Sequence, residues 1–226
     1  MLRISGYLAA LLVSSASAAG LDDISNRDAV AGLKEALSKG AEAAVAKLGK
    51  EDGFFGDPRI RIPLPRSMER AEAVMHSIGM GKQADDLVLR MNRAAEAAVP
   101  QAKSMLVDAA KKMTFQDAKG LLSGGDDSAT QYFKRTTSEP LAKRFKPIVK
   151  KAMAKVKLAE QYNAVAASGA KFGLVKEEDA NLEDYVTRKA LDGLFVSIAD
   201  EERKIRQNPL ESASAIISKV FGALAR

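Results

Sequence analysis

Cysteine is absent from this 226-residue sequence, and its absence restricts both the fold and the chemistry of the protein. A chain without cysteine forms no disulfide and offers no thiolate to a metal ion or a substrate. It also lacks an N-terminal cysteine to carry a lipid after export, so any membrane contact must be peripheral. We therefore expect side-chain packing alone to hold the fold together.

Histidine is nearly absent as well, since His76 is the only one. A zinc site would need carboxylates around this single ring, and a Ser-His-Asp triad would have to use it as the base. Because His76 follows Met75 inside a predicted helix, we interpret it as an ordinary histidine at the surface or the core edge. The Gly-Gly-Asp-Asp-Ser turn at 124–128 lacks the ending of a P-loop and the alternating ligands of a calcium loop. The sequence therefore predicts no catalytic residue, no metal and no cofactor.

Aromatic residues are scarce, at 5%, and tryptophan does not occur. Ala, Leu, Lys and Glu are abundant instead, a composition typical of helices and not of a β-sandwich or barrel. We predict an all-α fold, a single-domain bundle of about eight to ten helices over residues 20–226, since no repeat or low-complexity linker divides the chain. A long loop rich in Gly and Pro at 50–65 interrupts the helices, and the alternation over 59–62 predicts a short extended segment within it.

Long apolar runs are missing, apart from ten residues near the start of the chain. Ile4–Val13 follows Arg3 and precedes Ala16-Ser17-Ala18, a small-x-small cleavage pattern. Ten helical residues extend ~15 Å, half the ~30 Å thickness of a membrane core. We interpret residues 1–19 as a cleaved signal peptide and expect a soluble periplasmic or secreted protein, with no nucleic acid among its partners.

Apolar residues recurring at three- and four-residue steps predict the individual helices. These cover residues 26–48, 67–78, 82–99, 100–113, 114–122, 128–137, 138–157, 181–207 and 210–224. Ser25 or Asn26 is the expected N-cap of the first helix, and Asn181 that of the longest. Pro140 is expected to open a separate helix after a turn at Thr137, because proline is favoured in a first helical turn and costly inside a helix.

Charge is divided unevenly in the second half of the chain. Residues 134–157 contain nine Lys or Arg against Glu139 alone, whereas residues 177–202 contain nine acidic residues against Arg188 and Lys189. We expect the helices that carry these blocks to be neighbours, because both must bury an apolar side in the same core. The basic face then either pairs with the acidic block or binds an anionic envelope surface. The candidate residues for such a surface are Lys143, Lys146, Lys150, Lys151 and Lys155.

Polar residues on otherwise apolar helix faces are the candidate ligand-binding residues. Asn92 and Glu96 lie four residues apart, as do Glu202 and Arg206, so each pair shares one side of its helix. If these side chains face inward they must be paired, because an unpaired buried charge costs several kcal/mol. Two interpretations remain open: a structural ion-pair network, or a ligand pocket lined by these four residues together with the Tyr132 hydroxyl.

Several separated motifs are similar to one bacterial family. They are Gly32-Leu33-Lys34-Glu35-Ala36-Leu37, Ile60-Arg61-Ile62-Pro63-Leu64-Pro65, Met91-Asn92-Arg93-Ala94-Ala95-Glu96, Asp127-Ser128-Ala129-Thr130-Gln131-Tyr132-Phe133, Lys189-Ala190-Leu191-Asp192-Gly193-Leu194-Phe195 and Glu201-Glu202-Arg203-Lys204-Ile205-Arg206-Gln207-Asn208-Pro209. In this order, and across essentially the whole mature chain, they resemble the family called domain of unknown function 4197. The resemblance implies a helical, exported protein and carries over no catalytic or binding residue.

Our leading hypothesis is a non-enzymatic periplasmic protein that binds another envelope protein or a small ligand, because the sequence lacks the usual apparatus of catalysis. Peripheral binding to an anionic membrane through the basic helix at 134–157 is the second hypothesis. The third is a carboxylate-based hydrolase, in which Glu96 and Glu202 would form an acid and base pair about 5–10 Å apart.

Overall fold

The computed structural model describes residues 25–79, 81–154, 156–209 and 214–224, whose regular secondary structure is helical. The all-α prediction is therefore confirmed. The α-helices are α1 (Asn26–Leu48), α2 (Glu69–Ser77), α3 (Gly81–Ala98), α4 (Ala102–Lys112), α5 (Phe115–Leu122), α6 (Ser128–Met153), α7 (Lys157–Lys171), α8 (Leu182–Gln207) and α9 (Ala215–Leu224). Short 3₁₀ turns are η2 (Arg66–Met68), η3 (Val99–Gln101) and η4 (Glu177–Asp179). The predicted signal peptide, residues 1–19, lies outside the described residues.

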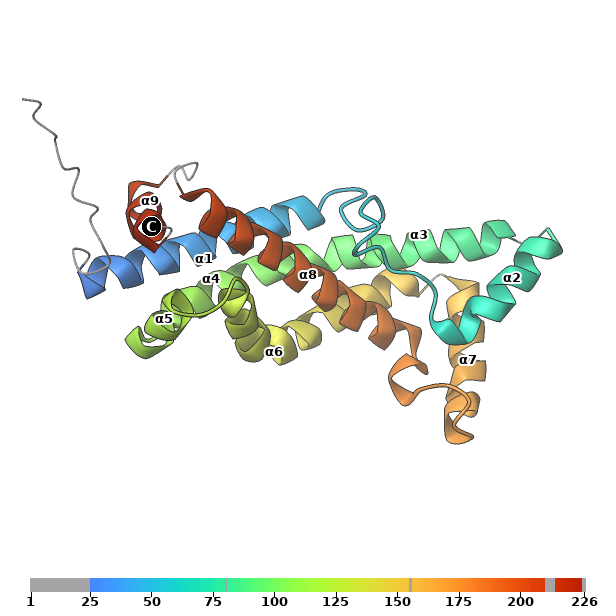
Figure 1. Cartoon of the computed structure of the whole chain (residues 1–226). Coiled ribbons are helices and arrows are strands. Elements are labelled where there is room, and N and C mark those ends of the chain that lie inside the picture. Colours follow the sequence, from blue (N-terminus) through green and yellow to red (C-terminus); the bar gives the residue numbers. More distant parts are fainter. Residues whose placement is uncertain (1–24, 80, 155, 210–213, 225–226) are drawn as a thin grey trace, which may run out of the picture.

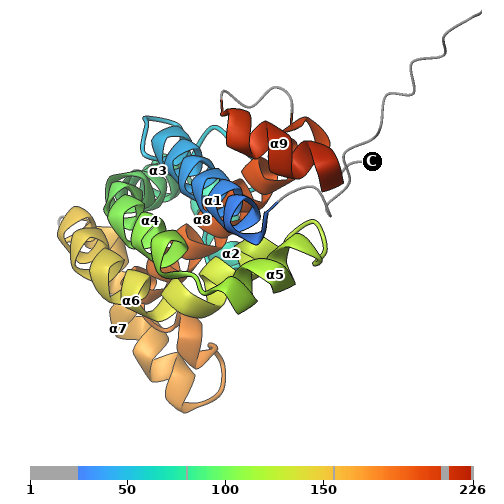
Figure 2. The same ribbon diagram turned by 90° about the vertical axis from the view of Figure 1, so that its left-hand side faces the viewer.

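The long helices α1, α3, α6 and α8 form the body of the bundle (Figure 1). Helix α8 crosses its neighbours diagonally and packs most extensively against α6, so the helices of the two charge blocks are neighbours as expected. Helix α9 lies against α1 at one end of the molecule (Figure 2), while α2 and α7 occupy the other end. None of the helices in the described ranges is both long and apolar enough to cross a membrane.

Two predicted caps position the ends of these helices. Ser25 Oγ accepts a hydrogen bond from Asp28 N–H (3.1 Å) at the start of α1. At the start of α8, Asn181 Oδ1 accepts from Asp184 N–H (2.9 Å). Each cap satisfies a backbone donor that has no partner within its own helix, which explains why α1 and α8 begin where the sequence predicts.

Helix α6 is continuous, so the predicted break at Thr137 is wrong. Its buried stripe, which is apolar except for Thr137, repeats at steps of four and shows no interruption there. The stripe consists of Phe133, Thr137, Leu141, Phe145, Val149 and Met153. Pro140 and Pro147 are both exposed, and each disrupts one turn of the helix at a cost of about 3 kcal/mol. Burial of large apolar side chains, at about 1.5–3 kcal/mol each, outweighs this cost.

Helix α7 is not predicted by the sequence pattern. Helix α6 ends at Met153, short of the predicted residue 157, and the chain turns before α7 begins at Lys157. The buried residues of α7 are Ala159, Tyr162 and Ala166, so its apolar periodicity is too sparse to identify it. As a result, α7 projects from the body of the bundle (Figure 1).

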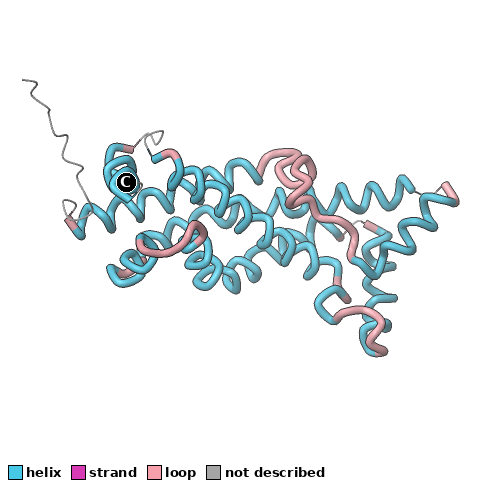
Figure 3. Tube along the Cα trace, in the orientation of Figure 1, coloured by secondary structure: helices cyan, strands magenta, loops and turns pink. Residues whose placement is uncertain are grey.

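The loop predicted at 50–65 joins α1 to α2 and packs across α3 and α8 (Figure 3). Residues 61–65 have no regular secondary structure, and within the described chain no strand pairs with them. Ile62 pairs instead with a side chain, because its N–H donates to Asn92 Oδ1 (2.8 Å) and its carbonyl accepts from Asn92 Nδ2 (2.9 Å). The amide of Asn92 thereby satisfies the backbone groups that a neighbouring strand would otherwise satisfy.

Candidate functional site

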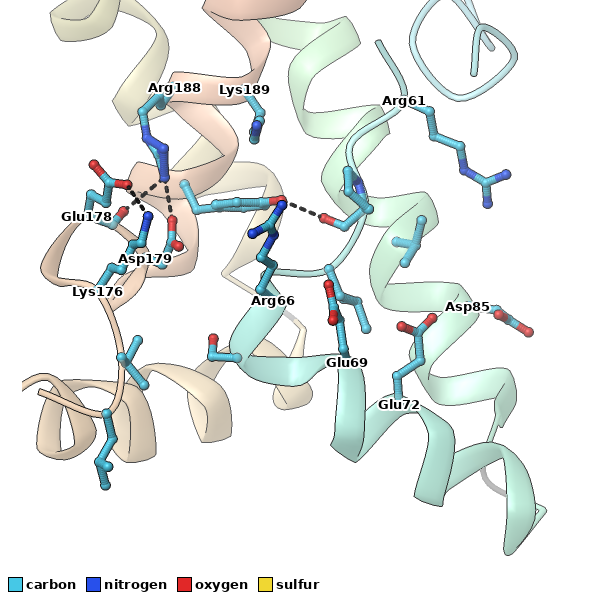
Figure 4. Close-up of a pocket in the computed structure, with 17 residues that line it drawn as sticks. Arg61, Arg66, Glu69, Glu72, Asp85, Lys176, Glu178, Asp179, Arg188 and Lys189 are labelled. Carbon is cyan, nitrogen blue, oxygen red and sulfur yellow. Dashed lines mark hydrogen bonds and ion pairs between the residues drawn. The ribbon is translucent and has the colours of Figure 1, made fainter. Parts of the chain in front are cut away.

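A cleft of about 1060 Å³ opens at the α2 and α7 end of the molecule (Figure 4). Its walls come from the segment 61–67, from α2, from the starts of α3 and α8, and from the 174–179 connection. The fold gathers these distant segments because α2 packs on α3, and both α3 and α7 pack on α8. The volume lies at the upper end of the ~300–1,000 Å³ that is usual for ligand pockets.

Charged side chains of both signs line the cleft. The basic ones are Arg61, Arg66, Lys176, Arg188 and Lys189, and the acidic ones are Glu69, Glu72, Asp85, Glu178 and Asp179. Figure 4 shows the acids of α2 and α3 on one side of the cleft and the bases of α8 on the other. Each side also carries charges of the other sign, since Arg61 and Arg66 lie near the acids while Glu178 and Asp179 lie beside Arg188, and neither charge is in excess.

The acids on the α8 side are already paired with neighbouring bases. Arg188 Nη2 contacts the carboxylate of Asp179 and also donates to the carbonyl oxygen of Glu178 (3.3 Å). Lys176 Nζ lies 3.9 Å from Glu178 Oε1. These two acids therefore lie against bases of their own wall, Asp179 in close contact with Arg188 and Glu178 in a longer, exposed pair with Lys176.

Five other charged side chains of the cleft have no such partner among the described residues, and one of them, Arg61, lies over the ring of Phe55 at 4.1 Å from its centroid. Within the part of the chain that the structure describes, Arg66 and Lys189 form no ion pair. The same holds, among the described residues, for Glu69 and Glu72 of α2. Lys189 Nζ lies 5.9 Å from the ring centroid of Tyr185, a cation–π contact that leaves its donors unoccupied. These side chains are the ones that a ligand meets first.

Two tyrosines fix the walls of the cleft. Tyr185 of α8 donates its hydroxyl hydrogen to the carbonyl oxygen of Pro63 (3.0 Å), which ties the extended segment to α8. Burial raises the pKa of Tyr185 to about 12, so the hydroxyl keeps its proton at neutral pH. Tyr162 of α7 donates to the carbonyl oxygen of Asp179 and accepts from Ser67 Oγ (3.0 Å), which ties η4 to η2.

Asn92 and Glu96, two of the predicted site residues, are buried and hydrogen-bonded as expected, at 0% and 5% exposure. Glu96 Oε1 accepts from the backbone N–H groups of Phe54 (3.0 Å) and Phe55 (3.2 Å). The other carboxylate oxygen of Glu96 accepts from Arg93 Nη1 (2.6 Å). Together with the pairing of Asn92, these bonds make the polar stripe of α3 the anchor of the loop between α1 and α2.

Glu202 and Arg206 form a second network at the start of α6, whose N-cap residue makes no side-chain cap. Glu202 Oε1 accepts from Ala129 N–H (3.0 Å), and Glu202 Oε2 accepts from Thr130 N–H (2.9 Å). Arg206 donates to Glu202 Oε1 through Nε (3.1 Å) and Nη2 (3.0 Å), and Nη2 also donates to the carbonyl oxygen of Leu121 (3.1 Å). A residue pair of α8 thus satisfies two N–H groups in the first turn of α6 and adds a donor to a carbonyl near the end of α5.

Tyr132 belongs to neither network, because its hydroxyl donates to the carbonyl oxygen of Ala109 in α4 (3.1 Å). The structure therefore brings Glu202 and Arg206 together and sets Asn92 and Glu96 in a separate network. None of these predicted residues lines the cleft among the side chains that the structure describes.

The sequence pattern misses the residues that do line the cleft. Arg66, Glu69 and Glu72 follow one another at three-residue steps, which indicates one side of a helical turn. Lys189 lies in another part of the chain, and only the packing of α3 on α8 places it beside them. No spacing within the sequence carries that information.

The basic face of α6 points to solvent. Its exposed residues are Lys143, Lys146, Lys150 and Lys151. Lys155 lies outside the described residues. Lys146 Nζ lies 2.6 Å from Asp184 Oδ1 of α8 and joins the two charge blocks, whereas Lys143 pairs with Glu139 of its own helix (2.6 Å). Lys150 and Lys151 form no ion pair with any described residue.

Among the described residues, no group of three or more His, Asp or Glu side chains is placed to hold a metal ion. His76 is about half exposed and lies 3.6 Å from Asp85 Oδ1, at the surface as expected.

Comparison with known proteins assigns the chain to a family. The family model described as "Protein of unknown function (DUF4197)" matches residues 23–222. The chain belongs to the DUF4197 family. The match confirms the resemblance in the sequence motifs, and every residue that lines the cleft of this DUF4197 protein falls within it. No curated protein and no solved structure shows a significant match to this DUF4197 chain.

Proposed function

We propose that this DUF4197 protein is an exported binding protein of the cell envelope, which holds a polar ligand in its cleft and catalyses no reaction on it. The observation that carries the proposal is the cleft, in which five charged side chains form no ion pair with a described residue. Such charged side chains lower the stability of the folded protein little while water hydrates them. Each gains a charge-assisted hydrogen bond when a complementary group of a ligand arrives.

The walls of the cleft support a binding role because they are fixed before a ligand arrives. The bond from Tyr185 to Pro63 and the bonds of Tyr162 to Ser67 and Asp179 hold the walls in place. Ordering a flexible side chain on binding costs about 0.5–1.5 kcal/mol. A preformed cleft avoids much of this cost.

The engaged carboxylates favour binding over hydrolysis. Glu96 and Glu202 each accept two backbone hydrogen bonds and at least one from an arginine. A catalytic acid needs a proton and direct access to substrate, and a base needs a free lone pair. Carboxylates that are fully occupied in this way suit a structural role.

Export is tested by sequencing the N-terminus of the protein recovered from the envelope fraction. We expect the mature chain to begin at Ala19 or Gly20, because Ala16-Ser17-Ala18 places small residues at the cleavage positions. A chain that still begins at Met1 in its final location would contradict export by this signal.

Ligand binding is tested by purifying the mature protein without denaturation from its own envelope, unfolding it, and identifying the released small molecules by mass spectrometry. The test variant is Arg66→Glu/Lys189→Glu, and the matched control is Lys112→Glu/Lys119→Glu, which reverses two exposed charges on α4 and α5 outside the cleft. We expect one compound to be released by the wild type and the control but not by the cleft variant. Release that is equal from all three proteins, or absent from all, would contradict the proposal.

Peripheral binding to an anionic envelope surface is a second candidate function. It is favoured by Lys150 and Lys151, which are exposed on α6 and pair with no acid among the described residues. Basic residues near an anionic membrane contribute about 1 kcal/mol each to binding.

A further inference from the structure

The charges of the cleft restrict the charge of its ligand. Glu69, Glu72 and Asp85 repel a purely anionic ligand, while Arg66 and Lys189 repel a purely cationic one. An uncharged apolar ligand would leave all of these side chains without a partner. A ligand with a carboxylate at one end and an ammonium group at the other finds an opposite charge for each of its ends.

The geometry of the charged groups suits these two ends. Glu69 and Glu72 are three residues apart on α2 and project from the same side of the helix (Figure 4). Two carboxylates match an ammonium group, which has three donors. Arg66 lies one helical turn before Glu69, and its planar fork matches a carboxylate in two-point contact, while Lys189 adds a second cation from α8.

Apolar side chains line the cleft together with the charged ones. Leu64 and Val88 line the cleft as buried side chains, and Leu174 is 80% exposed at its edge. At about 1060 Å³, the cleft is of the size that holds a ligand of several linked units and not a free amino acid. A peptide carries both charges on one chain and supplies side chains for the apolar surface.

We infer that the ligand of the cleft is a short zwitterionic peptide. Its terminal carboxylate binds Arg66 and Lys189, and its terminal ammonium group binds Glu69 and Glu72. This inference rests on the proposed binding function and names the class of ligand that the cleft takes.

The test measures the binding of one peptide in three forms by isothermal titration calorimetry. The forms are Ala-Leu-Ala-Ala with free termini, the same peptide with an acetylated N-terminus, and the same peptide with a C-terminal amide. The proteins are the mature wild type, Glu69→Gln/Glu72→Gln and Arg66→Gln/Lys189→Gln. Since none of these side chains has an ion pair with a described residue, we expect both variants to fold, which thermal unfolding checks.

Each modification should weaken binding to the wild type by about tenfold or more, because it removes one charged contact. In Glu69→Gln/Glu72→Gln, acetylation of the peptide N-terminus should cause no further loss of affinity, while amidation of its C-terminus should still weaken binding. The reverse should hold for Arg66→Gln/Lys189→Gln. Equal losses in all three proteins, tighter binding of phosphocholine than of the free peptide, or no binding of the peptide at 10 mM would each overturn the inference.

Failure of this inference is distinguishable from failure of the proposed function. If a released compound depends on Arg66 and Lys189 but the peptide does not bind, the cleft binds a ligand of another class, and only the inference is overturned. If no released compound depends on these residues and no peptide binds, the proposed function fails as well.

Discussion

The ring of Phe54 lies directly on the backbone of Gly193, and a Cβ atom at Gly193 would come within 2.5 Å of Phe54 Cε1. Phe54 is fully buried, at 0% exposure. The contact joins the loop between α1 and α2 to the middle of α8, and glycine is the residue that allows the ring to come so close.

Replacing Gly193 by alanine should therefore destabilise the protein. The added methyl group forces the Phe54 ring to move, and overpacking of this kind costs about 1–3 kcal/mol. Urea unfolding measures the loss. The matched control is Gly120→Ala on α5, where a Cβ atom meets nothing within 4 Å, and this substitution should be neutral or stabilising by up to about 1 kcal/mol. Equal stability of the two variants would contradict the role given to the Phe54 contact.

Replacing Glu202 by alanine should cost about 3–5 kcal/mol of unfolding free energy, the range found when one partner of a buried ion pair is removed. The substitution leaves Arg206 without its carboxylate, and it leaves the N–H groups of Ala129 and Thr130 without an acceptor. Chemical unfolding of the variant measures the effect.

The control for this substitution is Glu139→Ala, which removes a carboxylate from an exposed pair with Lys143 on α6. An exposed pair of this kind contributes about 0–1 kcal/mol. If Glu202→Ala were no more destabilising than Glu139→Ala, the capping of α6 by α8 would not contribute to stability.

The two parts of the basic face should respond differently to charge reversal. Lys146→Glu breaks the pair with Asp184 and should lower stability by about 1 kcal/mol or less at low salt, with a smaller effect at high salt because ions screen exposed charges. Thermal unfolding at two salt concentrations measures this difference.

Lys150→Glu/Lys151→Glu should leave stability unchanged or improved, because neither lysine pairs with a described acid. Binding to phosphatidylglycerol vesicles should weaken by about 30-fold or more, since two basic residues contribute about 2 kcal/mol. Sedimentation with these vesicles, compared with neutral phosphatidylcholine vesicles, measures binding. Undiminished sedimentation of the double variant would remove the anionic-surface function.

Stability should fall at alkaline pH through Tyr185, whose pKa burial raises from 10.0 to about 12. As pH rises, the unfolded chain loses the Tyr185 proton before the folded chain does. The contribution of this hydroxyl to the unfolding free energy is therefore fully present below pH 10 and is lost as pH rises through 12. A shift of this size corresponds to about 2–3 kcal/mol. Urea unfolding of wild type and Tyr185→Phe across this pH range should show a smaller decline for the variant. If the unfolding free energies of the two proteins declined in parallel, groups other than Tyr185 would account for the loss of stability at alkaline pH.

The helices could be predicted from sequence where local signals agree, and the errors have physical causes. The caps at Ser25 and Asn181 were sufficient for α1 and α8 because a cap is a local interaction. The predicted helix break before Pro140 is wrong because the local cost of this proline is outweighed by packing with distant helices. Burial of Asn92 and Glu96 followed from their place beside an apolar stripe, but their partners, which are backbone groups of a loop, have no signal in the sequence.

Tyr162 makes the local stability of α7 part of any binding event in the cleft. The buried residues of α7 number three, against nine in α6, so α7 should open locally at a lower free energy than α6. The hydroxyl of Tyr162 contacts both Ser67 of η2 and the carbonyl of Asp179 in η4. A ligand that contacts η2 and η4 therefore also stabilises the packed state of α7, and by thermodynamic linkage it should slow hydrogen exchange along α7 without touching that helix.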